Sequence, residues 1–291
     1  MKSLDMKKIA VLDDYQTVAL ESADWTPLNG RAEITVYNDH VDDDECLIDR
    51  LVPLDAICVM RERSPLPRKI LERLPNLRFI SSAGARNASI DLPAARDLGI
   101  VVSATGANGS GAPELTWALI LAAARHIPKE VTSFQKGGWQ TTVGQDLSGS
   151  TLGVIGLGKI GRQIAKVGQA FGMDFIAYSQ NLTDDAAQAA GVRRVEKEAL
   201  LREADWVTLH LVLSERTTGI IGREELAMMK PTAWLVNTSR GPLVDEIALI
   251  DAVEAKALAG IALDVFNVEP LPTSHRLRAL PNVIATPHLG L

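Results

Sequence analysis

The chain has 291 residues, of which 46% are hydrophobic and 23% charged, a balance typical of globular proteins that excludes a disordered one. Its 30 Lys and Arg against 36 Asp and Glu give a net charge of −6 without a long basic run, which argues against nucleic-acid binding through phosphates. No apolar run approaches the roughly 18 residues of a transmembrane helix, so we expect no membrane span. Ile9–Leu12 is too short for a secretory signal, and Cys46 and Cys58 show neither a disulfide framework nor metal-ligand spacing. These features predict a reducing, cytoplasmic setting.

The first hundred residues alternate short, almost continuously apolar runs with helical patterns. Five runs are predicted to be strands: Lys8–Leu12, Ile34–Tyr37, Ala56–Met60, Arg78–Ser81 and Ile100–Ser103. Helical patterns such as Pro67–Leu74 and Leu92–Leu98 lie between them. This alternation indicates a parallel sheet covered on both faces. The acidic run Asp42–Glu45 precedes a helical pattern and is predicted to be a solvated helix start rather than a metal site.

The alternation breaks at Thr105–Gly111 (TGANGSG). Pro113 then stands in the favoured first turn of a helix that we expect to run to about His126. Residues 128–150, which become rich in Gly, Thr and Ser, predict an irregular excursion. We therefore expect two domains, 1–105 and 106–291.

From residue 151 the alternation restarts more strongly. Six parallel strands are predicted: Leu152–Leu157, Phe175–Tyr178, Trp206–Leu211, Trp234–Thr238, Gly260–Val265 and Val283–Thr286. The predicted fold class is α/β, with a parallel sheet in each of the two domains.

A glycine-rich turn follows the first of these six strands and opens a helix. Its residues are Gly156, Leu157, Gly158, Lys159, Ile160 and Gly161. A bare G-x-G-x-x-G is weak evidence, but the strand–turn–helix context favours dinucleotide binding over a plain turn with incidental glycines. Gly156 permits the tight turn, Gly158 lets the backbone approach a pyrophosphate, and Gly161 lets helix and strand pack closely. Free N–H groups at the helix start then face the phosphates.

The cofactor form depends on the end of the next strand, where an acid would bind the 2′-hydroxyl of NAD. Ser179 and Gln180 stand there, and Asp174 lies at the wrong end of the strand. No carboxylate would repel a 2′-phosphate, and no arginine in the turn would attract one. Three nearby arginines are predicted to be solvated surface charges: Arg162, Arg193 and Arg194. The cofactor is therefore NAD or NADP, with the form undecided.

Polar residues stand at the carboxyl ends of several predicted strands, where ligands bind in an open α/β sheet. Arg240, Glu269 and His288 follow three different strands, and topology predicts that they converge. Each has an ordinary alternative, namely a surface arginine, a turn glutamate and a buried histidine. His210 ends another strand, but a structural role is favoured over a role in the site for this histidine. His40 gives no constellation.

On these residues the chain resembles the D-isomer-specific 2-hydroxyacid dehydrogenases along essentially its whole length. The matching segments are Gly153–Gly161 (GVIGLGKIG), Asn237–Gly241 (NTSRG), Ala262–Pro270 (ALDVFNVEP) and Thr286–Gly290 (TPHLG). Met60–Ser64 (MRERS) and Ser82–Asn87 (SAGARN) match the family's substrate-side loops. Gly137–Trp139 resembles part of the arm that pairs subunits, so the resemblance implies a homodimer.

The resemblance implies that the two domains are Rossmann-like with a cleft between them: a flavodoxin-like substrate domain and a doubly wound parallel-sheet domain that binds a dinucleotide. It also implies residue roles. Arg240 clamps the substrate carboxylate, His288 is the general acid/base, and Glu269 orients His288 and stabilises its protonated form. Arg61 and the backbone of Gly84–Ala85 anchor the carboxylate from the first domain. Four further residues are assigned to the cofactor side: His210, Thr238, Ser239 and Asp264. No metal is required.

The implied activity is hydride transfer between NAD(P)H and a small 2-oxo acid or D-2-hydroxy acid, such as glyoxylate or hydroxypyruvate. Two alternatives stay open: a cofactor-sensing or corepressor-like module without turnover, and a relative acting on formate, phosphite or phosphoglycerate. The chain departs from the family in lacking a proline soon after His210. It also stops three residues after His288, where the family continues with a helix that returns to the first domain. If the chain natively ends here, the missing helix predicts lowered stability and weak activity; a truncated sequence is the alternative.

Overall fold

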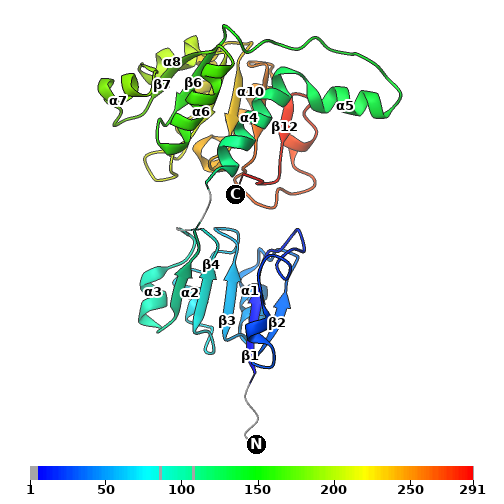
Figure 1. Ribbon diagram of the computed structural model, residues 1–291, viewed down its shortest axis with the longest axis vertical. Coiled ribbons are helices and arrows are strands. Elements are labelled where there is room, and N and C mark those ends of the chain that lie inside the picture. The colour runs from blue at the N-terminus through cyan, green and yellow to red at the C-terminus, as the bar shows by residue number, and fades with distance from the viewer. Residues whose placement is uncertain (1–5, 85–86, 107–108, 291) are drawn as a thin grey trace, which may run out of the picture. The chain divides into compact units, whose positions relative to one another are not determined.

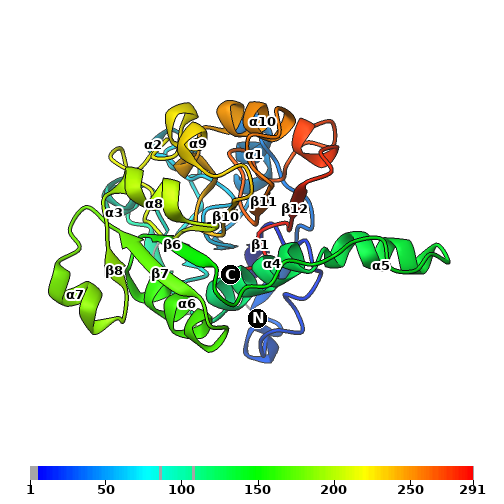
Figure 2. The ribbon, with the colours of Figure 1, turned by 90° about the horizontal axis from the view of Figure 1, so that it is seen from above.

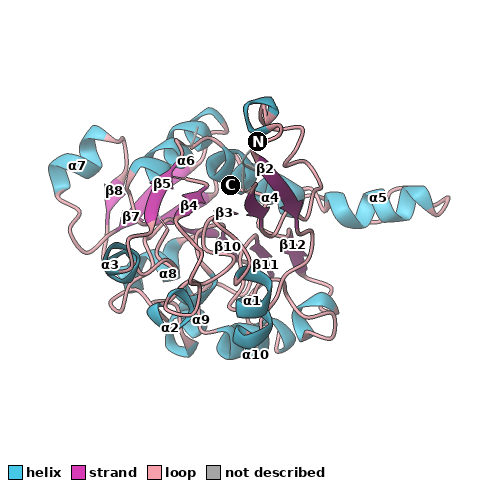
Figure 3. Ribbon diagram, turned by 90° about the horizontal axis from the view of Figure 1, so that it is seen from below, coloured by secondary structure: helices cyan, strands magenta, loops and turns pink. Residues whose placement is uncertain are grey.

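The structure is a computed structural model and describes residues 6–84, 87–106 and 109–290. The chain divides into two compact units, Met1–Asn108 and Gly109–Leu291. Each unit is built around a parallel sheet, and Figure 3 distinguishes the strands from the helices beside them. In the described part of the chain, no helix has the length and apolar character needed to cross a membrane.

The first unit contains a five-stranded sheet in the order β2-β1-β3-β4-β5, the flavodoxin-like order that the sequence predicts. Its strands are β1 Lys7–Val11, β2 Ala32–Val36, β3 Ala56–Val59, β4 Phe79–Ser82 and β5 Val101–Ala104. Its helices are α1 Asp44–Leu51, α2 Arg68–Leu71 and α3 Leu92–Asp97, preceded by a 3₁₀ turn at Thr26–Leu28. The core is aliphatic, with Leu51, Ile57 and Ile80 fully buried. The predicted strands are confirmed, with ends that differ by one or two residues.

The acidic run at residues 42–45 is the start of α1, as predicted. The side chain of Asp43 accepts a hydrogen bond from the backbone N–H of Cys46 at 2.9 Å and caps the helix. Asp44 and Glu45 lie in the first turn, where the helix dipole favours negative charge.

The second unit contains a seven-stranded parallel sheet in the order β12-β11-β10-β9-β6-β7-β8. Its strands are β6 Thr151–Ile155, β7 Asp174–Tyr178, β8 Arg193–Arg194, β9 Trp206–Leu209, β10 Trp234–Asn237, β11 Gly260–Leu263 and β12 Val283–Ala285. All six predicted strands are present. The seventh, β8, was not predicted because it is two exposed arginines long and carries no apolar signal.

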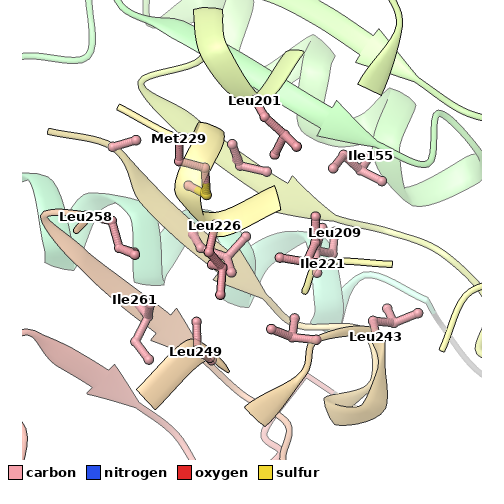
Figure 4. Close-up of a cluster of buried hydrophobic side chains, with 14 of the residues drawn as sticks. Ile155, Leu201, Leu209, Ile221, Leu226, Met229, Leu243, Leu249, Leu258 and Ile261 are labelled. Carbon is pink, nitrogen blue, oxygen red and sulfur yellow. The ribbon is translucent and has the colours of Figure 1, made fainter. Parts of the chain in front are cut away.

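Helices cover both faces of this sheet. They are α4 Gly111–Ala124, α6 Lys159–Ala170, α7 Asp184–Ala189, α8 Lys197–Glu203, α9 Arg223–Met228 and α10 Glu246–Glu254, with 3₁₀ turns at Gly241–Leu243 and Arg276–Arg278. Successive strand residues enter different cores: Val154 packs with α4, α6 and α7, whereas Ile155 packs with α8, α9 and α10. Figure 4 shows the second of these cores. Trp206 and Trp234 stack in the core that contains Val154, with ring centroids 6.0 Å apart.

A helical arm projects from the second unit. The arm begins with α5, Ile127–Gln135, which extends away from the sheet before the chain returns toward β6 (Figures 1 and 2). The predicted irregular excursion over 128–150 is therefore wrong in its first part, because Pro128 starts a helix there. The carboxylate of Glu130 on α5 accepts hydrogen bonds from the hydroxyls of Thr141 and Thr142 in the returning chain. These hydrogen bonds lower the pKa of Glu130 to about 2. The arm exposes five apolar side chains: Ile127, Val131, Phe134, Trp139 and Val143.

Candidate active site

The glycine-rich turn joins β6 to α6 in the second unit. Gly156 has φ 103°, and a Cβ atom there would lie 2.4 Å from the carbonyl oxygen of His210. A Cβ at Gly161 would lie 2.3 Å from the carbonyl oxygen of Gly156, so neither position accepts a side chain. Gly158, in contrast, faces open space, with no atom of the described residues within 4 Å of the position of a Cβ.

The start of α6 fits the pyrophosphate of a dinucleotide. No side chain caps the helix, and its first turn contains no acidic residue. The uncapped N–H groups and the helix dipole therefore remain available to an anion in the space beside Gly158.

The end of β7 lies beside this turn. The hydroxyl of Ser179 accepts a hydrogen bond from the backbone N–H of Leu157 at 2.8 Å. Asp174 is the first residue of β7 and so lies at the opposite end, as expected. The next residue after Ser179, Gln180, accepts a hydrogen bond through Oε1 from Nη1 of Arg216 at 3.3 Å. Sequence spacing gives no signal for Arg216, because it is 36 residues away and follows a different strand.

His210 follows β9 and supports the turn through its backbone. Its N–H donates to the carbonyl of Ile155 at 2.8 Å, and its ring Nε2 lies 2.9 Å from the hydroxyl of Thr208. Burial lowers the pKa of His210 to about 3, so the ring is neutral at physiological pH. These contacts are structural, and the predicted contact of His210 with a cofactor stays a prediction.

The loop that carries Arg240 follows β10. Buried Asn237 shapes this loop: its Oδ1 accepts from the N–H of Ser239 at 3.0 Å, and its Nδ2 donates to the carbonyl of Arg240 at 2.9 Å. The hydroxyl of Ser239 donates to the carbonyl of Leu209 at 2.7 Å, and the Thr238 hydroxyl lies 2.7 Å from that of Thr116. Both hydroxyls assigned to the cofactor side thus also hold β10 to its neighbours.

The Arg240 loop packs directly on the turn that carries Glu269. A Cβ at Gly241 would lie 2.1 Å from the carbonyl carbon of Phe266. In that turn, Oε1 of Glu269 accepts from the backbone N–H of Phe266 at 2.8 Å. Glycine at 241 therefore permits the approach of the two loops.

Glu269 and His288 form a hydrogen-bonded pair. Oε2 of Glu269 lies 2.6 Å from Nδ1 of His288, and the side chains are 27% and 17% exposed. Because Nδ1 faces the carboxylate, Nε2 is the ring atom left to exchange a proton with a ligand. His288 has φ 54°, an unusual backbone conformation that its surroundings must hold in place.

Asp264 holds the segment around His288. Its fully buried carboxylate accepts hydrogen bonds from the hydroxyl of Thr286 at 2.7 Å and from the backbone N–H groups of Leu289 and Gly290 at 2.8 and 2.9 Å. Its carbonyl accepts from the N–H of His288 at 2.9 Å. This positioning role was missed from the sequence, which assigned Asp264 to the nicotinamide end of the cofactor.

The three predicted catalytic residues follow neighbouring strands. β10 pairs with β11 and β11 pairs with β12, all parallel. Their carboxyl ends therefore deliver Arg240, Glu269 and His288 to one edge of the sheet. The glycine-rich turn follows β6 at the same edge.

The predicted substrate-side residues are adjacent within the first unit. Nε of Arg61 lies 3.6 Å from the position of a Cβ at Gly84, and Gly84 has φ 86°. The backbone N–H of Gly84 donates to the hydroxyl of Thr105 at 2.9 Å. Ala85, assigned together with Gly84, lies outside the described residues.

A buried network behind Arg61 was missed from the sequence. Asp13 follows β1 and accepts from the hydroxyl of Ser64 at 2.7 Å, while its other carboxylate oxygen lies 2.8 Å from Nδ1 of His40. Nη1 of Arg63 donates to the carbonyl of Asp13 at 2.8 Å. The network fixes the loop of residues 60–64, and it includes His40, for which the sequence indicated no constellation.

The fold and the glycine-rich turn define a two-domain α/β protein whose second unit binds a dinucleotide. A family model described as "D-isomer specific 2-hydroxyacid dehydrogenase, NAD binding domain" matches residues 117–290. The chain belongs to the D-isomer specific 2-hydroxyacid dehydrogenase family, which confirms the resemblance found in the sequence.

Relatives of the chain include enzymes with different named substrates. It is 38% identical to a hydroxypyruvate reductase of Thermotoga maritima, over 90% of this chain and 86% of that protein. It is 42% identical to a D-3-phosphoglycerate dehydrogenase of Methanocaldococcus jannaschii, over 84% of this chain and 47% of that protein. The chain spans about half the length of the phosphoglycerate dehydrogenases that it matches first.

Solved structures share the fold of the chain. The structure of a phosphoglycerate oxidoreductase from Vibrio cholerae o395 matches with a TM-score of 0.90 and 39% identity, over 98% of this chain and 92% of that one. The predicted fold class, two Rossmann-like α/β domains, is thereby confirmed.

Proposed function

We propose that the protein is an NAD(P)-dependent D-2-hydroxyacid dehydrogenase that reduces a small 2-oxo acid such as glyoxylate or hydroxypyruvate. The observation that carries this proposal is the Glu269–His288 pair at 2.6 Å, which follows strands of the same sheet edge as the glycine-rich turn. The hydroxypyruvate reductase among the relatives supports the substrate class.

The residues divide the reaction as follows. A nicotinamide cofactor bound at the glycine-rich turn would supply the hydride for reduction of the 2-oxo group. Nε2 of His288 donates the proton that the forming alkoxide needs, while Glu269 fixes the orientation of the ring through Nδ1. The guanidinium of Arg240 binds the carboxylate of the substrate in a planar, two-pronged fashion. Arg61 and Gly84 stay our prediction for further carboxylate binding by the first unit.

Phosphoglycerate is the second candidate substrate. It is favoured by the names of two similar proteins, the dehydrogenase of M. jannaschii and the oxidoreductase of V. cholerae. A cofactor sensor without turnover is the less favoured alternative, because a sensor has no need of a histidine held by a glutamate.

The second unit also supports the predicted homodimer, since the arm exposes apolar side chains that a second copy would cover. A cytoplasmic location is proposed from the two free cysteines.

Turnover with a panel of substrates tests the proposal. Purified protein is assayed with NADH and with NADPH against glyoxylate, hydroxypyruvate and pyruvate, and in the oxidative direction with 3-phosphoglycerate. We expect oxidation of the reduced cofactor by at least one 2-oxo acid. His288→Ala should lower kcat by a factor of about 10² to 10⁴ and leave cofactor binding unchanged.

His126→Asn is the matched control. It changes a histidine that also has a positive φ but lies on the arm, and it should retain full turnover. Turnover of His288→Ala near that of the wild type would contradict the assignment. Binding of a cofactor without turnover of any substrate would favour the sensor instead.

A further inference from the structure

We propose that the nucleotide site accepts the 2′-phosphate of NADP(H) and that Arg216 is the residue that binds it. The inference rests on the proposed function for the presence of a nucleotide, and it goes further by assigning the cofactor form and a residue for it.

The position of Arg216 is the first observation. In a dinucleotide-binding fold, the residues that follow the second strand of the unit contact the ribose of the adenosine. Here these are Ser179 and Gln180, after β7, and Nη1 of Arg216 donates to Oε1 of Gln180 at 3.3 Å. An arginine from the loop after β9 therefore stands where the 2′-substituent of that ribose is expected.

Hydrogen bonds hold the backbone of the loop that carries Arg216, although the side chain of Arg216 is exposed. The hydroxyl of Thr217 accepts from the backbone N–H of Ser214 and donates to the carbonyl of Val212, both at 2.8 Å. The N–H of Thr218 donates to the carbonyl of Ser214 at 2.9 Å. The backbone is thus fixed before a ligand arrives, and binding has to order only one side chain.

Arg216 brings a positive charge to the expected ribose position. Among the described residues, Arg216 forms no ion pair, whereas Arg193 and Arg194 on β8 pair with Glu203 and Asp184. In the described part of the chain, Gln180 accepts from one N–H of the guanidinium, so other N–H groups can make a two-pronged contact with a phosphate.

Ser179 offers a second hydrogen-bond donor, and it stands where NAD-specific proteins have an acidic residue. Its oxygen accepts from the N–H of Leu157, which leaves its own proton for a ligand. A carboxylate at this position would bind a 2′-hydroxyl and repel a 2′-phosphate. None is present at residues 179–181, which read Ser-Gln-Asn.

Calorimetric titration of the whole chain tests the inference without relying on turnover. The ligands are NADPH, NADH, adenosine 2′,5′-bisphosphate and adenosine 5′-monophosphate. We expect each 2′-phosphorylated ligand to bind more tightly than its partner. Arg216→Ala should weaken the two 2′-phosphorylated ligands by about tenfold or more and change the other two by less than about threefold. Raised salt should weaken the same two ligands most.

Two further variants sharpen the test. Ser179→Asp supplies the missing carboxylate and should reverse the preference toward NADH, while still accepting from Leu157. Arg223→Ala removes an exposed arginine that pairs with Asp251 and should change none of the four affinities. The melting temperature of each ligand-free variant shows whether it folds. Because the side chain of Arg216 is exposed, Arg216→Ala should melt at the temperature of the wild type.

The outcomes separate the inference from the proposed function. Equal affinity for NADPH and NADH, or an Arg216→Ala protein that binds NADPH as the wild type does, overturns the inference and leaves the dehydrogenase proposal intact. Absence of binding by either dinucleotide overturns both.

Discussion

Gly241 and Phe266 approach so closely that a single added methyl group would collide with the backbone of Phe266 at 2.1 Å. This contact couples two loops from neighbouring strands. One loop carries Arg240, and the other contains Glu269, whose carboxylate accepts from the N–H of Phe266. The position of the arginine relative to the Glu269–His288 pair therefore depends on the absence of a side chain at residue 241.

Gly241→Ala should separate these loops. Because the colliding atoms belong to backbone, relief requires a backbone shift, which costs about 1–3 kcal/mol. We expect the free energy of unfolding, measured in urea, to fall. We also expect kcat/KM to fall, because Arg240 is displaced. Gly222→Ala is the control: a Cβ there has its nearest contact at 3.4 Å, so both quantities should stay near wild type. Unchanged kcat/KM in Gly241→Ala would contradict the coupling.

Asp264→Asn should release the segment around His288. An amide cannot accept at both of its ends, so at least one bond from Thr286, Leu289 or Gly290 is lost inside a fully buried site, at about 1–3 kcal/mol. We expect a lower melting temperature of the cofactor-free protein together with reduced turnover. Asp174→Asn, at the exposed start of β7, should leave both unchanged. A change in cofactor affinity with no change in the free protein's stability would favour the nicotinamide contact instead.

Glu269→Gln should impair catalysis more than binding. The carboxylate accepts from Phe266 through one oxygen and faces His288 with the other, whereas an amide offers one acceptor and one donor. If the amide oxygen keeps the bond from Phe266, the NH2 group faces Nδ1 of His288, which must then accept instead of donate, so the protonated ring loses its acceptor. We expect kcat to fall by about tenfold to a hundredfold, with cofactor affinity preserved in the same titrations. Full activity of Glu269→Gln would show that the pair has no role in proton transfer.

His210 should make the second unit sensitive to acid. Its pKa is about 3 in the folded chain, below the ordinary value of 6.5, because burial disfavours the charged ring. As the pH falls through 6.5 the unfolded chain takes up a proton and the native chain does not, so the free energy of unfolding falls by up to about 1.4 kcal/mol per pH unit. Urea unfolding between about pH 7 and pH 5 measures this slope. His210→Asn should flatten it, and an identical slope in that variant would refute the assignment.

Much of the fold could be predicted because parallel strands buried on both faces are apolar runs. Val154 and Ile155 are adjacent and enter opposite cores, so both must be hydrophobic. The two-residue strand β8 carries no such run, and α5 is a short helix whose exposed face has no core to pattern it. Both were missed for this reason.

The site could be predicted in part. Strand order decides which loops are neighbours, so the carboxyl ends of β10, β11 and β12 could be expected at one edge once the strands were recognised. Contacts between distant loops follow no spacing rule. The pair Arg216–Gln180, the close approach of Gly241 to Phe266 and the hold of Asp264 on the segment of His288 all depend on atomic positions.

The stacked indoles of Trp206 and Trp234 give the second unit its own optical signal. Both are buried in one core, and the other three tryptophans of the chain are Trp117 and Trp139 in the same unit and Trp25 in the first. A Trp25→Phe chain would therefore emit from the second unit alone, and its difference from the parent chain isolates the first. Intrinsic fluorescence can thus reveal whether the two units melt together or in sequence.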